Sequence, residues 1–182
     1  MRELSLHILD ALQNSVEAGA SRVKLTIVED LTADRLTIIL DDNGRGMDAE
    51  TVKKAVDPFF TTRTTRRVGL GLPLFAAAAQ QCNGDLTIES ELGKGTRIRV
   101  IFQHSHIDRA PMGDICGSLL TLLLSKEPVD LHYVHRVNGS QFEFDTVEIR
   151  TELDDVPLSH PAVCDWLRDF IAQGELSLRD RG

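Results

Sequence analysis

The sequence predicts an α/β (α+β) two-layer sandwich, in which helices cover one face of a mixed, mainly antiparallel sheet. Three observations predict this fold class. Strand-like segments alternate apolar and polar residues with a period of two, so each strand buries one face. Helix-like segments repeat apolar residues at helical spacing and bury one stripe. Finally, the first 103 residues run helix, two strands, two helices, two strands, which favours one layer of helices on one sheet face.

The amino-terminal elements follow from these two periods. A helix is predicted from Glu3 to Ala18, with Gly19 as its stop. The segments SRVKLTIVE (21–29) and DRLTIILDD (34–42) alternate as half-buried strands and are expected to pair across a short connection. The apolar stripe of the helix consists of Leu4, Ile8, Leu9, Leu12 and Val16.

Two helices and two strands are predicted next. MDAETVKKAV (47–56) is typical of a short helix with an acidic first turn, and LPLFAAAAQQCNG (72–84) of an alanine-rich helix that ends at Asn83-Gly84. DLTIES (85–90) and TRIRVIF (96–102) are expected to be strands on either side of the turn ELGKG.

Residues 108–182 are predicted to form a small acidic α/β C-terminal appendage to a first domain of residues 1–107. ICGSLLTLLLS (115–125) indicates a helix, and residues 130–150 indicate a hairpin turned at Asn138-Gly139. The acidic run ELDD (152–155) is expected to be a solvated connection. The stripe of the last helix is expected to be appendage core and comprises Val163, Trp166, Leu167, Phe170 and Ile171.

Composition limits the function classes. Hydrophobic residues make up 42% and charged residues 26% of the 182 residues, as in a folded globular protein. The net charge is -8, with most of the acidic excess after residue 103, and no basic face for nucleic acid is evident. No apolar run or leader-like stretch indicates a membrane or secretion, so a cytoplasmic location is expected. Three widely spaced cysteines favour buried free thiols.

The stretch DDNGRGMD (41–48) holds the first candidate site. Asp42 is in phase with the apolar side chains of its strand and is predicted to point toward the core, whereas Asp41 points away. An inward carboxylate needs a cation or hydrogen-bond donors, such as an exocyclic amine. Gly44 and Gly46 allow a sharp turn and the approach of a flat ligand. The alternative is a glycine-rich turn whose acid binds local N–H groups.

The first helix adds a polar arc on which His7, Asp10, Asn14 and Glu17 are expected to lie opposite the apolar stripe. Asn14 could hold a hard cation such as magnesium, and Asp10 could orient a water or accept a proton. The alternative is an ordinary solvated helix face.

FFTTRTTRRVGLGLP (59–73) is typical of an anion site, because arginines and hydroxyls precede two glycines at a helix start. The arginines could equally serve only to solubilise a loop. The histidines after residue 103 are expected to be scattered on the surface, since His132 and His135 are three apart on a predicted strand and face opposite sides.

Together these motifs resemble the GHKL ATPases, which share the Bergerat fold and include sensor histidine kinases, anti-sigma-factor kinases, MutL, gyrase B and Hsp90. DALQNSVEAGAS resembles the asparagine box, DDNGRGM the first glycine box and DPFFTTR the phenylalanine-containing segment of histidine kinases. GLGL is similar to the second glycine box and GKGT (93–96) to the last. Five motifs in the expected order cover residues 3–103.

The resemblance implies that ATP and Mg²⁺ are the cofactors. It implies that Asn14 coordinates the magnesium, that Asp42 accepts the adenine amine, and that residues 58–68 form a short ATP lid. Asp10 stands where related ATPases have a catalytic glutamate, one methylene longer, so it is the candidate catalytic residue. The residues expected to contact ATP are Asn14, Asp42, Gly44, Gly46, Met47, Phe60, Thr61, Thr62, Arg63, Gly69, Leu70, Gly71, Leu72 and Thr96.

The expected function is a regulatory Mg-ATP-binding protein kinase, of the anti-sigma type or a detached kinase module, that phosphorylates a separate protein partner. No phosphoacceptor motif of the form His-Glu-x-x-Arg is present, and His7 is interpreted as structural. Two alternatives remain open, a non-catalytic ATP-sensing module and a slow ATPase of the MutL or chaperone type. A homodimer is left open, and neither nucleic acid nor membrane is expected as a partner.

Overall fold

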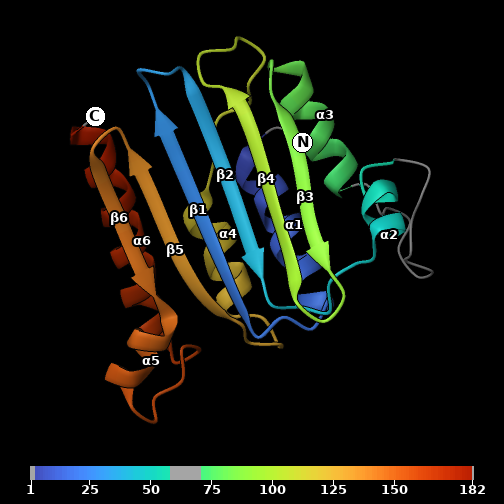
Figure 1. Cartoon of the computed structure of the whole chain (residues 1–182). Coiled ribbons are helices and arrows are strands. Elements are labelled where there is room, and N and C mark those ends of the chain that lie inside the picture. The colour runs from blue at the N-terminus through green and yellow to red at the C-terminus, as the bar shows by residue number, and fades with distance from the viewer. Residues whose placement is uncertain (1–2, 58–70, 182) are drawn as a thin grey trace.

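A single six-stranded sheet organises the chain, in the strand order β3-β4-β2-β1-β5-β6 (Figure 1). The computed structural model describes residues 3–57 and 71–181. Neighbouring strands are antiparallel except for the parallel pair β1 and β5, which confirms the mixed, mainly antiparallel sheet. The strands are β1 (Arg22–Asp30), β2 (Arg35–Asp42), β3 (Asp85–Glu91), β4 (Gly95–Gln103), β5 (Asp130–Val137) and β6 (Ser140–Asp145). The helices are α1 (Leu4–Glu17), α2 (Ala49–Lys54), α3 (Gly71–Gln81), α4 (Ile115–Leu123), α5 (Thr146–Leu153) and α6 (Pro161–Arg181).

The helices α1, α3, α4 and α6 lie on one face of the sheet, and the other face is uncovered (Figure 1). The period-two pattern explains this arrangement, because the alternate apolar residues of β1 and β2 are almost fully buried beneath the helices. The two strands pair antiparallel across their short connection, as predicted. The buried set comprises Val23, Leu25 and Ile27 of β1 and Leu36, Ile38 and Leu40 of β2.

Helix α1 lies in the middle of the helical layer, between α3 and α4. Leu4, Ile8 and Leu12 of its predicted stripe are completely buried. Its first turn is bonded to the segment before α4, since the backbone N–H groups of Leu4 and Ser5 donate to the carbonyls of Pro111 and Met112. These bonds anchor the first turn of α1, and its contacts with α3 and α4 hold the helix against the sheet.

Residues after 107 continue the same sheet and the same core. Strand β5 lies parallel to β1, with Leu25 opposite Tyr133, and β6 adds the edge. Leu119 of α4 and Leu131 of β5 are fully buried in one cluster with the side chains of α1 and β1. The domain boundary at residue 107 stays a prediction. In the structure, strands from before and after this residue lie in one continuous sheet.

The carboxyl-terminal prediction needs three corrections. The hairpin ends at Asp145 rather than at residue 150, because the Asp145 side chain accepts a bond from the Val147 N–H and starts α5. The run 152–155 is not wholly a connection, because its first two residues end α5. Trp166 is not core: it is 48% exposed and stacks on Phe170 at the outer side of α6.

Cysteines match the expectation only in part. Cys82 is a buried free thiol, but Cys116 and Cys164 are half-exposed. Burial raises the pKa of the Cys82 and Cys116 thiols, so both favour the protonated form at neutral pH.

Candidate functional site

An inward-facing acid, Asp42, ends strand β2 on the helix side of the sheet. The buried Ser15 hydroxyl donates to its Oδ2 at 2.6 Å, and the Gly44 N–H donates to its Oδ1 at 2.9 Å. Each oxygen therefore has one donor among the described residues and still has acceptor capacity. This carboxylate is held in place and can accept a further hydrogen bond from a ligand.

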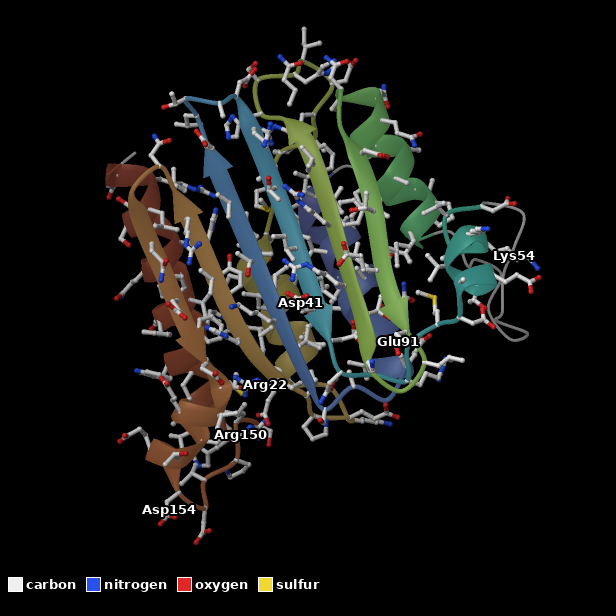
Figure 2. The ribbon with its side chains drawn as sticks, in the orientation of Figure 1. Arg22, Asp41, Lys54, Glu91, Arg150 and Asp154 are labelled. Carbon is white, nitrogen blue, oxygen red and sulfur yellow. The ribbon has the colours of Figure 1, made fainter. Side chains whose placement is uncertain are left out.

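Its neighbour Asp41 lies on the opposite, uncovered face of the sheet (Figure 2). There it pairs with Arg97 of β4, whose Nη1 lies 3.5 Å from Asp41 Oδ1. The predicted phase of the strand is thus confirmed, and the two adjacent acids have separate environments.

Glycines form a tight backbone surface beside Asp42. An added Cβ at Gly44 would lie 2.9 Å from the Cβ of Ala18. Gly46 has a φ of 71°, and a Cβ there would overlap the carbonyl oxygen of Glu91; Gly95 has a φ of 103°, and a Cβ there would overlap the carbonyl oxygen of Asp42. Glycine is therefore required at these positions by the close packing of the chain after β2 against α1 and the β3–β4 turn.

A pair of hydroxyls lies next to these glycines. Thr96 is the register partner of Asp42 in β4, and its Oγ1 lies 2.8 Å from Ser90 Oγ. The Ser90 oxygen also accepts the Met47 N–H at 2.8 Å. These contacts bring Met47 and Thr96, both predicted site residues, to the same corner as Asp42.

The polar side of α1 faces the start of α3. Asp10 and Asn14 are both half-buried and lie one helical turn apart on α1. A Cβ added to Gly71, the first residue of α3, would lie 3.4 Å from Asp10 Cβ. The predicted carboxylate, amide and helix start therefore lie together, and Leu72 follows, half-buried against the core.

His7 does not belong to a solvated arc, so this part of the prediction is wrong. It is only 3% exposed and stacks on Phe75 of α3, with ring centroids 5.0 Å apart. Burial lowers the pKa of His7 to about 4, so the ring is neutral at physiological pH. Its Nδ1 has no hydrogen-bond partner among residues 3–57 and 71–181. The interpretation of His7 as a structural residue agrees with this packing.

Six predicted contact residues cannot be placed. They fall outside the described ranges, as does the predicted lid at 58–68, and they are Phe60, Thr61, Thr62, Arg63, Gly69 and Leu70.

Three residues of the site were missed by sequence reasoning. Ser15 falls in phase with the buried stripe of α1, and Ser90 falls in phase with the buried Leu86 of β3. A hydroxyl within an apolar stripe is a signal for both, because a buried hydroxyl needs a partner. Gly95 lies within the last glycine motif but has no such signal. Its role follows only from the structure, in which the carbonyl of Asp42 at the end of β2 packs against it.

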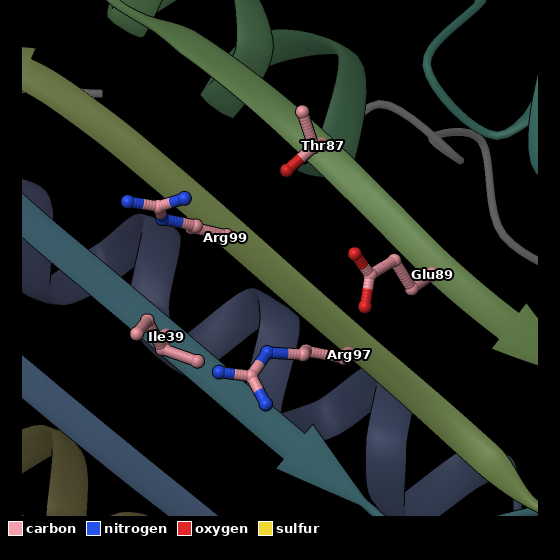
Figure 3. Close-up of a pocket in the computed structure, with 5 residues that line it drawn as sticks. All are labelled: Ile39, Thr87, Glu89, Arg97 and Arg99. Carbon is pink, nitrogen blue, oxygen red and sulfur yellow. The ribbon is translucent and has the colours of Figure 1, made fainter.

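A shallow groove of about 390 Å³ lies elsewhere, on the uncovered face of the sheet (Figure 3). Arg97 and Arg99 of β4 and Glu89 of β3 line it together with Thr87 and Ile39. The sheet separates it from Asp42, so it is no part of the site above. No three His, Cys, Asp or Glu side chains in residues 3–57 and 71–181 cluster as a metal site would require.

A buried polar cluster ties α6 to the sheet and corrects the expectation of surface histidines. His135 is 4% exposed, and its Nδ1 and Nε2 lie 2.8 Å from Glu175 and 2.9 Å from Glu29. Burial opposes the charged ring, but the two carboxylates outweigh it and raise the pKa of His135 to about 9. The bond from His135 lowers the pKa of Glu29 to about 2. Tyr133 donates to Glu175 at 2.7 Å and completes the cluster.

The sequence of residues 2–106 matches the family described as histidine kinase-, DNA gyrase B-, and HSP90-like ATPase. The chain belongs to this family. The matched region contains α1 to β4 and every predicted site residue, so these elements are an ATP-binding, histidine-kinase-like domain of the GHKL type.

Curated relatives are similar over the same region. Sporulation kinase C of Bacillus subtilis is 33% identical over 99 residues, which are 54% of this chain and 23% of the relative. The signal transduction histidine-protein kinase AtoS of Escherichia coli is 36% identical over 95 residues, which are 52% of this chain and 16% of the relative. The chain thus spans less than a quarter of the length of these relatives.

A solved structure supports the fold. The crystal structure of the N-terminal domain of a DNA repair protein superimposes with a TM-score of 0.53 over 79% of this chain and 52% of that chain, at 14% identity. The sheet and its helical layer are consistent with the Bergerat fold of the family. None of the described helices is long and apolar enough to span a membrane.

Proposed function

We propose that the protein binds Mg-ATP and acts in regulation as a protein kinase that phosphorylates a separate protein. The observation that carries the proposal is Asp42, an inward acid that accepts from Ser15 and from the Gly44 N–H and has Gly44 and Gly46 beside it. In the proposal its carboxylate accepts the exocyclic amine of adenine, Gly44 and Gly46 form the floor beneath the base, and Met47 and Thr96 lie at its edge.

The phosphates lie between α1 and α3 in this proposal. Asn14 supplies an amide oxygen, a ligand type that suits Mg²⁺, and the ion neutralises phosphate charge when it is bound. Gly71 at the start of α3 offers backbone N–H groups to the anion, and its close packing on Asp10 supports this placement. The predicted residues at 60–63 and 69–70 complete the contacts.

The kinase assignment rests on the relatives that are named as kinases. In this proposal the phosphoacceptor belongs to a separate protein partner, as in an anti-sigma-type kinase or a detached kinase module. The proposed location is the cytoplasm, where ATP is available. A homodimer is compatible with this proposal.

Calorimetry with ATP and Mg²⁺, followed by incubation of the protein and a cell lysate with ATP labelled in the terminal phosphate, tests the proposal. Saturable binding that requires Mg²⁺ and transfer of label to a protein are expected. Binding without transfer or turnover would instead favour the ATP-sensing module. Phosphate release without transfer would favour the slow ATPase, in which case Asp10→Asn abolishes turnover and spares binding. Absence of ATP binding would refute the proposal.

A further inference from the structure

A second groove lies at the end of the sheet opposite Asp42. It has a volume of about 400 Å³ and is formed where the ends of β1 and β5, the start of β2, the segment after β4 and the end of α6 meet (Figure 1). Its volume falls within the range of about 300–1,000 Å³ that is usual for small-molecule sites. Both the ATPase-family region and the later residues contribute walls, and pockets are frequent at such seams.

The floor of this groove is apolar. Leu36 is fully buried and Leu178 is 2% exposed, and each presents only hydrocarbon to the groove. Val137 and Met112 are half-buried beside them, and Leu31 stands 44% exposed at the rim. Since Leu36 and Leu178 are already shielded from water, a ligand gains by covering the exposed apolar area of Leu31, Val137 and Met112 above them.

The charges on the walls do not cancel. Arg109 donates from Nε to the His104 carbonyl at 2.5 Å and from Nη1 to the Ala110 carbonyl at 3.1 Å, so two backbone carbonyls hold its guanidinium in place. Neither Arg109 nor Arg179, at the end of α6, forms an ion pair with an acid in the described part of the chain.

The acid on the wall, Glu29, is already engaged. Its Oε1 lies 2.9 Å from His135 Nε2 and its Oε2 lies 2.7 Å from His104 Nε2. The one positive charge of His135 is shared between Glu29 and Glu175, so it does not cancel Glu29. Among the residues that line the groove, Glu29 is a single acid against two arginines, Arg109 and Arg179, which leaves the lining with a positive balance. The groove therefore combines an apolar floor with a net positive rim.

We propose that this groove binds a small organic anion, a carboxylate with an aliphatic body. The body covers Leu31, Val137 and Met112, which lie over the buried Leu36 and Leu178. The carboxylate pairs with Arg109 and Arg179 at the rim. The site lies at the end of the sheet opposite the ATP site and does not depend on the function proposed above.

Octanoate is a suitable probe, followed by the methyl resonances of Leu36, Val137 and Leu178 in the full chain. Saturable shifts of these methyls are expected. Acetate, which lacks the body, and octylamine, which carries the opposite charge, should bind at least about tenfold more weakly, because each loses one of the two recognition elements. Non-saturable shifts with octanoate, or equal binding of octylamine, would overturn the proposal.

Two surface variants sharpen this test without disturbing the core. Arg179→Gln removes a cation from the rim, and Leu31→Glu adds an acid that repels the carboxylate. Each variant should bind octanoate about tenfold more weakly. Matched controls are Arg168→Gln, an exposed arginine on the same helix, and Leu92→Glu, a 63% exposed leucine in the β3–β4 turn. Unchanged octanoate affinity in both groove variants would contradict the assignment. ATP affinity, measured in parallel, should be the same in all four variants. A failure of the groove proposal can therefore be told apart from a failure of the proposed ATP site.

Discussion

The stability of the fold should fall between pH 6.5 and pH 9.5 because His135 loses its proton. The pKa of this buried histidine is raised from 6.5 to about 9 by Glu175 and Glu29, which outweigh burial. A group whose pKa is higher in the folded state stabilises fully below its unfolded pKa. That stabilisation then disappears as pH rises through the folded value. The variant that isolates the effect is His135→Gln, which has hydrogen-bonding capacity but no charge.

The magnitude follows from the shift. One pKa unit corresponds to about 1.4 kcal/mol, so a rise from 6.5 to about 9 corresponds to ~3 kcal/mol of folding free energy. The lowered pKa of Glu29 arises from the same hydrogen bond and is not added to this figure. Since a shift of this size is a large part of the stability of an ordinary domain, it is readily measured.

Urea unfolding followed by circular dichroism at several pH values between 6.5 and 9.5 measures the effect. The wild type should lose about 3 kcal/mol more than His135→Gln over this window. His132→Gln is the matched control, because His132 pairs with the exposed Glu143 on the open face of the sheet. It should retain the wild-type pH dependence. Equal pH dependence in the wild type and His135→Gln would refute the reasoning.

Three further substitutions test separate parts of the structure. Gly46→Ala should destabilise more than Gly93→Ala in thermal unfolding, because both have positive φ but only Gly46 faces a backbone carbonyl; equal losses would show that the contact is absent. Ser15→Ala removes the hydroxyl that donates to Asp42 at 2.6 Å, and the ATP affinity measured by calorimetry should fall by about tenfold. Wild-type affinity would contradict a role for this hydroxyl. Leu119→Ala, in α4, should cost about 2–5 kcal/mol and keep one unfolding transition by circular dichroism, since its buried side chain joins the core shared by both parts; two transitions would indicate separate domains.

Local periodicity predicted much of the fold and the position of Asp42. Alternation in DRLTIILDD separated the inward Asp42 from the outward Asp41, because side-chain direction in a strand depends only on sequence position. The buried stripe of α1 and the glycine turns could be predicted for the same reason, since each is determined by a few neighbouring residues.

The pairing of strands that lie far apart in the sequence could not be predicted. Nothing in the sequence places β5 parallel to β1, and this pairing is what buries His135 beside Glu29 and Glu175. His7 was misplaced because a polar residue at a helical position was assigned to solvent, whereas α3 brings Phe75 over it. The start of α5 was not predicted, because its β-branched residues continue the pattern of the preceding strand. In the structure, Asp145 caps a helix at this point.

The most direct test of the ATP site compares Asp42→Asn with Asp41→Asn by calorimetry with ATP and Mg²⁺. In the account given above, Asp42 accepts the adenine amine as a carboxylate, so its amide variant should bind ATP about tenfold or more weakly. Asp41→Asn lies on the open face and should bind as the wild type does. Wild-type affinity in Asp42→Asn, or an equal loss in Asp41→Asn, would contradict the placement of the base.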